Sequence, residues 1–399
     1  MKILYVTPLW TGLKDILFNG FEEARGMPAF IKPLKELISR GHEVDLFLIH
    51  NFKKYPKYNL IIDWLKKEQI VGELYWDNIL IKKPSNMLKL YINILQILKV
   101  REYNFVYGHG GTAEIARKAA AKLNISFGQR LYGTFLYDYI EKNSLFKARI
   151  VRYLEYNSFK SPKSFLLVTN DGSKGDKAYN LINKNKKPCD FYFWHNGVDR
   201  FENIPNEKLM KEYAKLGNEP FLFHVARIDR WKRQDKAIRI LKLLKDKNYN
   251  LKLYIAGQII SETYYEELKR LIDEMQLKDH VVFLNAISRD TINIMSKLAI
   301  ASLSLNDMCN LGNVFHEMLS AGAVIISNND GSLDEFIKHG ENGFLINDLE
   351  EACDYIIKVM NDKEYEKRIR EKAISTSKEK MKSWEERVGD EIELIERYS

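Results

Sequence analysis

Short apolar runs alternate with amphipathic segments from one end of the chain to the other, and this order constrains the fold more than any other feature. Runs that are apolar throughout are typical of strands buried on both faces, as in parallel sheets covered by helices. The alternation therefore predicts an α/β fold with parallel sheets. The expected strands are residues 2–7, 43–49, 104–107, 127–132, 165–169 and 191–195 in the first half, and residues 221–226, 251–256, 281–284, 299–304 and 323–327 in the second.

The length of the chain, 399 residues, predicts two domains, because single hydrophobic cores rarely grow to that size. Residues 196–220 are polar and lack a strand pattern, so they are the best linker candidate. We expect two doubly wound, Rossmann-like domains, one over residues 1–197 and one over residues 198–382. A last helix, beginning at residue 383, could pack on either domain. Such domains bind ligands outside the carboxyl ends of their strands, here in the cleft between the domains.

Several classes of protein are disfavoured by what the sequence lacks. The three cysteines, Cys189, Cys309 and Cys353, are widely spaced, so neither a disulfide framework nor a zinc site is encoded. No apolar run approaches the roughly 20 residues that span a bilayer, and the first run is too short for a signal peptide. The glycine patterns of dinucleotide and P-loop sites, the serine elbow of hydrolases and short metal-binding motifs are absent. We therefore expect a cytoplasmic protein without a dinucleotide cofactor or a bound metal.

The positive charge of the chain is concentrated in its first half. Residues 1–200 contain 32 Lys and Arg against 19 Asp and Glu, a net of +13, whereas residues 201–399 contain 30 against 35, a net of −5. One interpretation is that the first half contacts an anionic partner, such as the inner face of a membrane or a charged acceptor, near the apolar helix at residues 86–99. The other is that this helix packs in a core and the lysines are solvated. Nucleic acid is disfavoured, because no segment resembles a groove-reading helix or a base-stacking motif.

Residues 309–326 read as a loop of small residues, a short helix and a buried strand. A helix that opens from such a loop presents its first N–H groups outward and can bind an anion. Here these groups belong to Gly312, Asn313 and Val314. Glu317, one turn inside, cannot serve the anion but can accept hydrogen bonds from a neighbouring diol. Phosphate beside ribose indicates a nucleotide-linked substrate; the alternative is an ordinary strand–helix unit with a solvated acid.

Two cations follow the expected strand at residues 221–226. Arg227 and Lys232 lie on the loop at its carboxyl end, where they could clamp a diphosphate, the arginine as a planar fork and the lysine as a point charge. Because 62 of the 399 residues are Lys or Arg, their position carries more weight than their spacing.

Three other strand ends carry candidate loops. After residues 104–107, a Gly-His-Gly-Gly sequence would let the backbone approach a ligand and would project His109 into the cleft. The alternative is a tight turn with an exposed histidine. Gly257 and Ile287 follow the next two strands of the second half, in loops that could hold a nucleobase by backbone hydrogen bonds or serve only as turns.

In their order and spacing, these segments resemble glycosyltransferase family 4, whose members are retaining enzymes of the GT-B fold. The resemblance covers nearly the whole chain and is strongest from residue 196 to residue 345. Its motifs are Arg40-Gly41-His42-Glu43-Val44, Tyr107-Gly108-His109-Gly110, His195-Asn196-Gly197-Val198-Asp199, Val225-Ala226-Arg227 with Lys232, Ile255-Ala256-Gly257, Val282-Phe283-Leu284, Glu317-Met318-Leu319-Ser320-Ala321-Gly322 and Glu341-Asn342-Gly343-Phe344-Leu345.

The resemblance implies a nucleotide-sugar donor held mainly by the second domain, an acceptor held mainly by the first, and no obligatory metal. It also implies that the last helix crosses back onto the first domain. Arg227 and Lys232 match the pair that binds the donor diphosphate, and Glu317 matches the ribose-binding acid. His109 matches the first-domain histidine near the transferred sugar, and Gly26 lies about where the family has a glycine-rich loop.

Two departures from the family pattern bear on activity. Cys309 occupies the position of the first acid of the frequent Glu-x7-Glu pair, and Asp307 is two residues early. Asn310 and Asn313 are then the nearest amides for the donor sugar, and Tyr132 stands where many relatives have histidine. Our leading hypothesis is a retaining glycosyltransferase that moves a sugar to a glycan, lipid-linked or other hydroxyl acceptor in polysaccharide or glycoconjugate biosynthesis. The alternatives are a weakly active or inactive partner subunit and a sugar-nucleotide epimerase, for which no acid/base set is visible.

Overall fold

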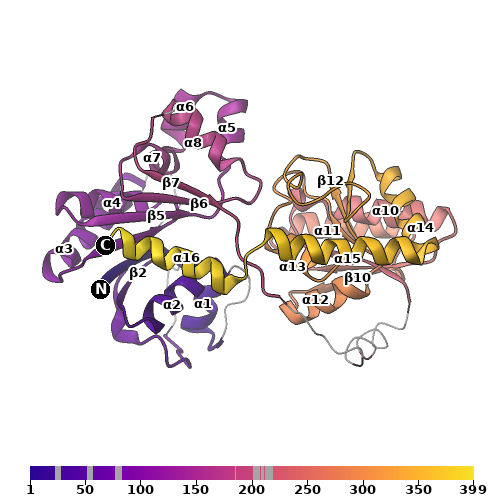
Figure 1. Ribbon diagram of the computed structural model, residues 1–399, viewed down its shortest axis with the longest axis horizontal. Helices are drawn as coiled ribbons and strands as arrows, with labels where there is room; N and C mark the ends of the chain where they lie inside the picture. Colours follow the sequence, from indigo (N-terminus) through magenta and orange to yellow (C-terminus); the bar gives the residue numbers. More distant parts are fainter. Residues whose placement is uncertain are drawn as a thin grey trace. The chain divides into compact units, whose positions relative to one another are not determined.

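A computed structural model gives the structure of residues 1–22, 28–51, 57–76, 83–184, 186–200, 207, 211 and 219–399. Gly26 and most of the expected linker lie outside the described residues. The chain divides into two compact units, which Figure 1 shows coloured along the sequence. Unit 1 contains Met1–Asn196 and Trp384–Ser399, and unit 2 contains Gly197–Ser383.

Unit 1 is built on a parallel seven-stranded sheet in the order β3-β2-β1-β4-β5-β6-β7. Its strands are β1 (Lys2–Pro8), β2 (Glu43–His50), β3 (Ile70–Tyr75), β4 (Phe105–His109), β5 (Ser126–Leu131), β6 (Phe165–Thr169) and β7 (Asp190–Trp194). The central strand β1 is covered on both faces, which accounts for its continuous apolar run. The strand order reverses at β1, which pairs with β2 on one side and β4 on the other. The carboxyl ends of β1 and β4 therefore form the switch point where this kind of sheet binds ligands.

The helices of unit 1 pack on both faces of its sheet. They are α1 (Thr11–Phe18), α2 (Lys32–Ser39), α3 (Lys83–Val100), α4 (Ala113–Lys122), α5 (Leu136–Lys142), α6 (Leu145–Val151), α7 (Tyr153–Lys160), α8 (Gly175–Asn183) and α16 (Trp384–Arg397). Helix α3 buries Leu90, Ile94 and Leu98 in a stripe at helical spacing. This stripe supports the interpretation of the segment as a core helix, while Leu88 and Ile92 stay exposed on its outer side.

Helix α16 packs in unit 1, although it directly follows unit 2 in sequence (Figure 1). Its buried stripe, which includes Val388 and Ile392, belongs to the same core as Leu34 of α2. At the end of the helix, Glu396 Oε1 lies 2.9 Å from Nε2 of His42. The last helix thus contributes side chains to the core beneath β1 and β4.

Unit 2 contains a parallel six-stranded sheet in the order β10-β9-β8-β11-β12-β13. Its strands are β8 (Phe221–Val225), β9 (Lys252–Ala256), β10 (Val281–Asn285), β11 (Ala301–Ser304), β12 (Ile325–Asn328) and β13 (Phe344–Ile346). Its helices are α10 (Gln234–Asp246), α11 (Glu262–Glu274), α12 (Arg289–Leu298), α13 (Asn313–Ser320), α14 (Leu349–Asn361) and α15 (Lys363–Lys380), with a short 3-10 helix η4 (Arg230–Lys232) after β8. The order reverses at β8, between β9 and β11, so the loops after these strands share one edge. The expected doubly wound α/β architecture is confirmed in both units.

Candidate functional site

Arg227 projects from the loop after β8, at the carboxyl edge of the sheet of unit 2. The next residue, Ile228, is buried and donates its N–H to Gln258 O at 2.9 Å. Gln234 Nε2 donates to Arg227 O at 3.0 Å. These bonds fix the main chain and leave the arginine side chain exposed. Within the described residues its guanidinium has no hydrogen-bond or ion-pair partner, so it is available to an anion.

Lys232 ends the 3-10 helix η4 on the same loop. Its Nζ lies 3.6 Å from the centre of the Trp231 ring, a cation–π contact that orients the ammonium group. Burial, and after it the charge of Lys232, lowers the pKa of His224 in β8 to about 4. The ammonium therefore lies close to the end of β8, the strand that Arg227 follows.

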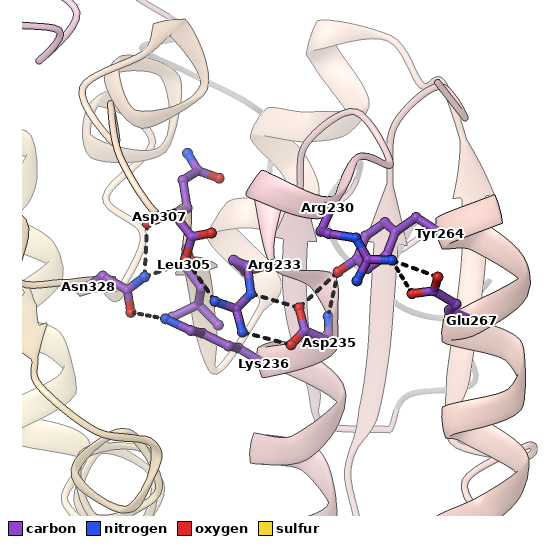
Figure 2. A network of polar contacts seen from close by, with 10 residues as sticks. Arg230, Arg233, Asp235, Lys236, Tyr264, Glu267, Leu305, Asp307 and Asn328 are labelled. Atoms are coloured by element: carbon purple, nitrogen blue, oxygen red, sulfur yellow. Dashed lines mark hydrogen bonds and ion pairs between the residues drawn. The ribbon is translucent and has the colours of Figure 1, made fainter. Parts of the chain in front are cut away.

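Other charged groups near this loop are committed to holding it in place. Figure 2 shows Arg233, whose Nε and Nη2 donate to Asp235 at 3.0 and 2.9 Å and whose Nη1 donates to Asp307 at 2.8 Å. Lys236 Nζ donates to Asn328 Oδ1 at 3.4 Å. These contacts tie the loop after β8 to the loop after β11 and to the end of β12. Asp307, two positions before the family's acid, therefore has a structural ion pair.

The N-terminus of α13 faces open space. Gly312 caps the helix in an extended conformation, and a Cβ at this position would meet no atom within 4 Å. The first bond within the helix runs from His316 N to Gly312 O at 3.2 Å. The N–H of Gly312, predicted to point outward, instead donates to Asn310 O at 3.0 Å, so of the three predicted groups those of Asn313 and Val314 are left at the start of the helix. These groups and the helix dipole favour an anion at this end.

Asn310 organises the loop that leads to α13. Its Oδ1 accepts hydrogen bonds from Ser304 Oγ at 3.0 Å and from Asn306 N at 3.1 Å. Its Nδ2 donates to Asn306 O at 3.1 Å and to Asp330 Oδ2 at 2.9 Å. All four positions of the amide are used inside unit 2, and the neighbouring Cys309 has a left-handed backbone with φ of 57°. Asn310 therefore shapes the loop, and its amide has no position left for a donor sugar in this arrangement.

Glu317 lies in the second turn of α13, where it is 8% exposed. Burial raises its pKa to about 7; the charge of Arg289 limits this rise, and that of Asp199 adds to it. Arg289 Nε is 3.7 Å from Glu317 Oε1, and Arg289 Nη1 donates to Asp199 Oδ2 at 2.8 Å. The charge of Arg289 favours the ionised form of this carboxyl group, which could accept hydrogen bonds from a diol beside it.

Gly257 joins neighbouring loops at the same edge of the sheet. Its φ is 152°, and a Cβ there would lie 1.9 Å from Ala226 O, so only glycine fits. Its N–H donates to Asn285 O at 2.7 Å. Ile287, in the loop after β10, packs partly buried against the core under β8 and β9. Both predicted residues thus lie in loops that begin at this edge.

Among the residues that the structure describes, His109 is the predicted site residue of unit 1, and it lies at the end of β4. It is fully buried, its ring stacks on Tyr5 at 4.1 Å between centres, and its Nδ1 is 2.7 Å from the hydroxyl oxygen of Tyr132. Burial, helped by the charge of Arg130, lowers the pKa of His109 well below its usual value. The imidazole is therefore neutral at pH 7, and within the described residues its Nε2 has no hydrogen-bond partner.

A charged cluster lies beneath His109. Glu391 of α16 is fully buried and accepts a hydrogen bond from Tyr107 Oη at 2.6 Å and one from Arg387 Nη1 at 3.2 Å. It also pairs with Arg130 of β5. Burial, together with the neighbouring Arg130, lowers the pKa of Arg387 to about 10. One carboxylate thus pairs with two guanidinium groups beside the histidine, and helix α16 supplies it.

Sequence reasoning missed four charged residues of these clusters. They are Asp199, Arg289, Arg387 and Glu391. Glu391 carried a usable signal, because an acid inside the apolar stripe of a helix needs a buried partner. No sequence pattern marked Arg289, because it is a single arginine among 62 Lys and Arg residues.

Comparison with known proteins identifies relatives by sequence. Residues 205–376 match the family model described as "Glycosyl transferases group 1". The GDP-Man:Man(3)GlcNAc(2)-PP-Dol alpha-1,2-mannosyltransferase of Dictyostelium discoideum is 29% identical over 122 residues, which are 29% of this chain and 24% of that protein. The N-acetyl-alpha-D-glucosaminyl L-malate synthase of Bacillus anthracis is 24% identical over 225 residues, which are 55% of this chain and 56% of that protein. The chain thus spans about a quarter and about half of these two relatives.

Solved structures show a likeness over nearly the whole chain. The structure of Anabaena Alr3699/HepE in complex with UDP and glucose superposes with a TM-score of 0.70, with 98% of each chain covered and 17% sequence identity. At this identity the likeness concerns the fold.

Proposed function

We propose that the chain is a retaining glycosyltransferase with a nucleotide-sugar donor, because residues 205–376 match the family model of the group 1 glycosyl transferases and the chain has the GT-B fold that its sequence predicted. One observation carries the proposal. The loop that bears Arg227 and Lys232 is bonded to the loop that leads into α13, through Asp307 N and Trp231 O at 3.0 Å. Unit 2 therefore offers two cations, an open helix N-terminus and a buried acid along one edge of its sheet.

The chemistry follows from this set of groups. Arg227 and Lys232, with the first N–H groups of α13, stabilise the negative charge that develops on the leaving nucleoside diphosphate. Glu317 accepts hydrogen bonds from the hydroxyl groups of the ribose. In this proposal, side chains and backbone amides stabilise the negative charge of the leaving diphosphate. The reaction therefore requires no metal and no covalent bond between sugar and enzyme.

We place the acceptor on unit 1, at the carboxyl ends of β1 and β4. Beneath these strand ends lies the neutral and fully buried His109, held by Tyr132 and Tyr5. Its buried Nε2 has no partner among the described residues, so a hydroxyl group of the sugar or acceptor that entered here would satisfy it.

The acceptor class is a glycan, a lipid-linked sugar or another hydroxyl compound of polysaccharide or glycoconjugate biosynthesis. The Dictyostelium relative is named for a PP-Dol-linked acceptor, which supports the lipid-linked case. No helix among the described residues has the length and apolar character to cross a bilayer. We therefore propose a cytoplasmic location with peripheral contact at the inner face of an anionic membrane.

A second candidate is an inactive partner subunit that binds an acceptor protein or another transferase. Cys309 favours it, because a thiol with a left-handed backbone replaces the acid expected near the donor sugar. The transferase is favoured by the residues that are retained near one edge of the sheet of unit 2, which are Arg227, Lys232 and Glu317.

A donor screen tests both candidates. The purified chain is mixed with UDP-, GDP-, ADP- and dTDP-sugars, and thermal unfolding and release of nucleoside diphosphate are measured. We expect one base to stabilise the chain, by about 2.7 kcal/mol at 100 times its Kd, and the same donor to be consumed. Stabilisation without consumption would favour the partner subunit. Neither effect with any donor would contradict the transferase, whereas the partner subunit, which binds another protein, needs no donor.

A further inference from the structure

Helix α6 presents large apolar side chains to solvent. Phe146 is 72% exposed, Ile150 62% and Val151 55%. Phe146 and Ile150 are four residues apart, so they are neighbours on one side of the helix. Of the residues of α6, Ala148 is fully buried and anchors the inner face. A helix that shows most of its apolar surface is typical of a binding face rather than of a face meant for water.

Cations surround these apolar side chains. Lys147 and Arg149 are exposed on α6, and Arg152 follows the helix directly. No acidic residue occurs from position 145 to position 152. Arg152 lies over the Tyr139 ring at 5.4 Å, and Lys147 Nζ donates to Asn143 Oδ1 at 2.8 Å, so neither of these contacts neutralises a charge. The surface of α6 is therefore apolar at its centre and positive at its margin. We call Phe146, Lys147, Arg149, Ile150 and Val151 the α6 patch.

The segment that carries the α6 patch is fixed to the sheet of unit 1. It follows β5 and reaches β6 through three short helices instead of a single one. At its base, Thr134 bonds to Glu155 of α7 through its side chain and donates its N–H to Ser173 Oγ at 2.8 Å. Gln129 Nε2 donates to Ser158 Oγ of α7 at 2.8 Å. Figure 1 shows α5 and α6 beyond α7 and α8, at the upper end of unit 1.

We propose that the α6 patch docks the chain on an anionic lipid bilayer. Aromatic and aliphatic side chains on a short helix enter the boundary between headgroups and acyl chains, and Lys or Arg beside them pairs with lipid phosphates. Charge complementarity selects this occupant, because an anionic surface matches the two cations of the patch and the adjacent Arg152, with no acid from position 145 to position 152. Within the described ranges, Ile260 is the one exposed large apolar side chain that lies in unit 2, and the others lie in unit 1. Unit 1 is therefore the unit that faces the lipid. The docking surface is thus α6, and not α3, to which the sequence had pointed.

Vesicle co-sedimentation of the full chain tests the proposal without using the transferase activity. The probes are vesicles of phosphatidylcholine alone and of phosphatidylcholine mixed with phosphatidylglycerol, at low and moderate salt. We expect binding to the mixed vesicles that weakens as salt rises, and little binding to phosphatidylcholine alone. Phe146→Ser/Ile150→Ser and Lys147→Glu/Arg149→Glu should each lower binding at least about tenfold, since each cation near an anionic surface contributes about fivefold.

Matched variants separate this surface from the rest of the molecule. Leu88→Ser/Ile92→Ser on α3 removes a second exposed apolar pair with the same spacing, and Lys367→Glu/Lys372→Glu on α15 makes the same change in net charge. Both controls should bind within about twofold of the unmodified chain, and thermal unfolding should show that all four variants fold. No binding by the unmodified chain at either salt concentration would overturn the proposal. An α3 variant that loses as much binding as the α6 variants would overturn it as well.

Discussion

At the scale of residues, Glu317 combines burial with a nearby cation that is already paired. Desolvation raises its pKa to about 7, and the attraction of Arg289 does not offset this, because Arg289 is bonded to Asp199. The carboxyl group is thus poised to change charge near neutral pH. A ribose diol donates hydrogen bonds, so it binds the ionised form better than the protonated one.

Donor binding should depend on the ionisation of Glu317. The affinity for a nucleotide-sugar should rise as the pH increases from about 6 to about 8, through the pKa of this group. Glu317→Gln should bind at least about tenfold more weakly at the higher pH and show a flat profile. Calorimetric titration checks this, with a nucleotide-sugar as ligand because its diphosphate diester does not titrate in this range. A Gln variant that kept the pH dependence would assign it to another group.

The same group should make stability pH-dependent in the opposite direction. The folded-state pKa lies above the ordinary value, so folding favours the protonated form. The stabilisation of this form is complete below about pH 4.5 and is lost as the pH rises through about 7. Glu317→Gln should therefore be more stable than the unmodified chain at pH 8, by up to about 3 kcal/mol, and should gain nothing near pH 4.5. Urea unfolding at the two pH values measures the difference.

Asn310 should matter for stability. Asn310→Ala removes four hydrogen bonds of a buried amide and leaves Asn306 and Asp330 without this partner. We expect the free energy of unfolding to fall by about 2–3 kcal/mol. Cys309→Ala, in the same loop, should change it by less than about 0.5 kcal/mol. Chemical denaturation compares the two, and equal stability of both variants would mean that the amide does not hold the loop.

At the scale of elements, helix α16 connects the end of the sequence to the candidate acceptor site. Its Glu391 pairs with Arg130 of β5 and with Arg387, and it accepts a hydrogen bond from Tyr107 of β4, the strand that carries His109. A buried carboxylate with such partners is strongly coupled to them. Loss of its charge would take from two buried guanidinium groups the carboxylate with which both of them pair.

Glu391→Gln should destabilise unit 1 by about 3–5 kcal/mol. Glu393→Gln, on the exposed side of the same helix, should be close to neutral. Guanidinium chloride unfolding, followed by the fluorescence of Trp194 and Trp384, checks this pair. If the two variants were equally stable, the cluster would not depend on the charge of α16.

Most elements could be predicted from sequence because they are central. The strands β1, β4 and β8 are buried on both faces and read as apolar runs, and the last helix shows a clear stripe. The edge strands β3 and β13 were not expected: β3 is half exposed and contains Gly72 and Glu73, and β13 has three residues. The partial burial of β3 weakens its apolar pattern, and three residues in β13 are too few to show a period.

The candidate site was predictable to a different degree in each unit. The residues of unit 2 follow neighbouring strand ends, so order along the chain was enough to bring Arg227, Gly312 and Glu317 to one edge. What could not be read is how each group is used. Asn310 turns its amide inward, and Arg289 comes to Glu317 from the start of another helix. Such contacts depend on side-chain direction across the fold, which periodicity does not encode.

At the scale of the whole molecule, we propose one task for each unit. Unit 2 would hold the nucleotide-sugar through Arg227, Lys232 and the start of α13, and unit 1 would hold the acceptor and meet the membrane. The charge of the chain agrees with this division, with +13 in residues 1–200 and −5 in residues 201–399. The positive half is the one that carries the α6 patch.

The central claim is that Arg227 acts on the donor diphosphate, and turnover of matched arginine variants tests it most directly. Arg230 is the control, because it is exposed on the same loop but its guanidinium is paired with Glu267 (Figure 2). With the donor found in the screen, Arg227→Ala should lower kcat at least about a hundredfold, as loss of one stabilising donor does. Arg230→Ala should stay within about twofold. Turnover near that of the unmodified chain in Arg227→Ala, or an equal loss in both variants, would contradict the account.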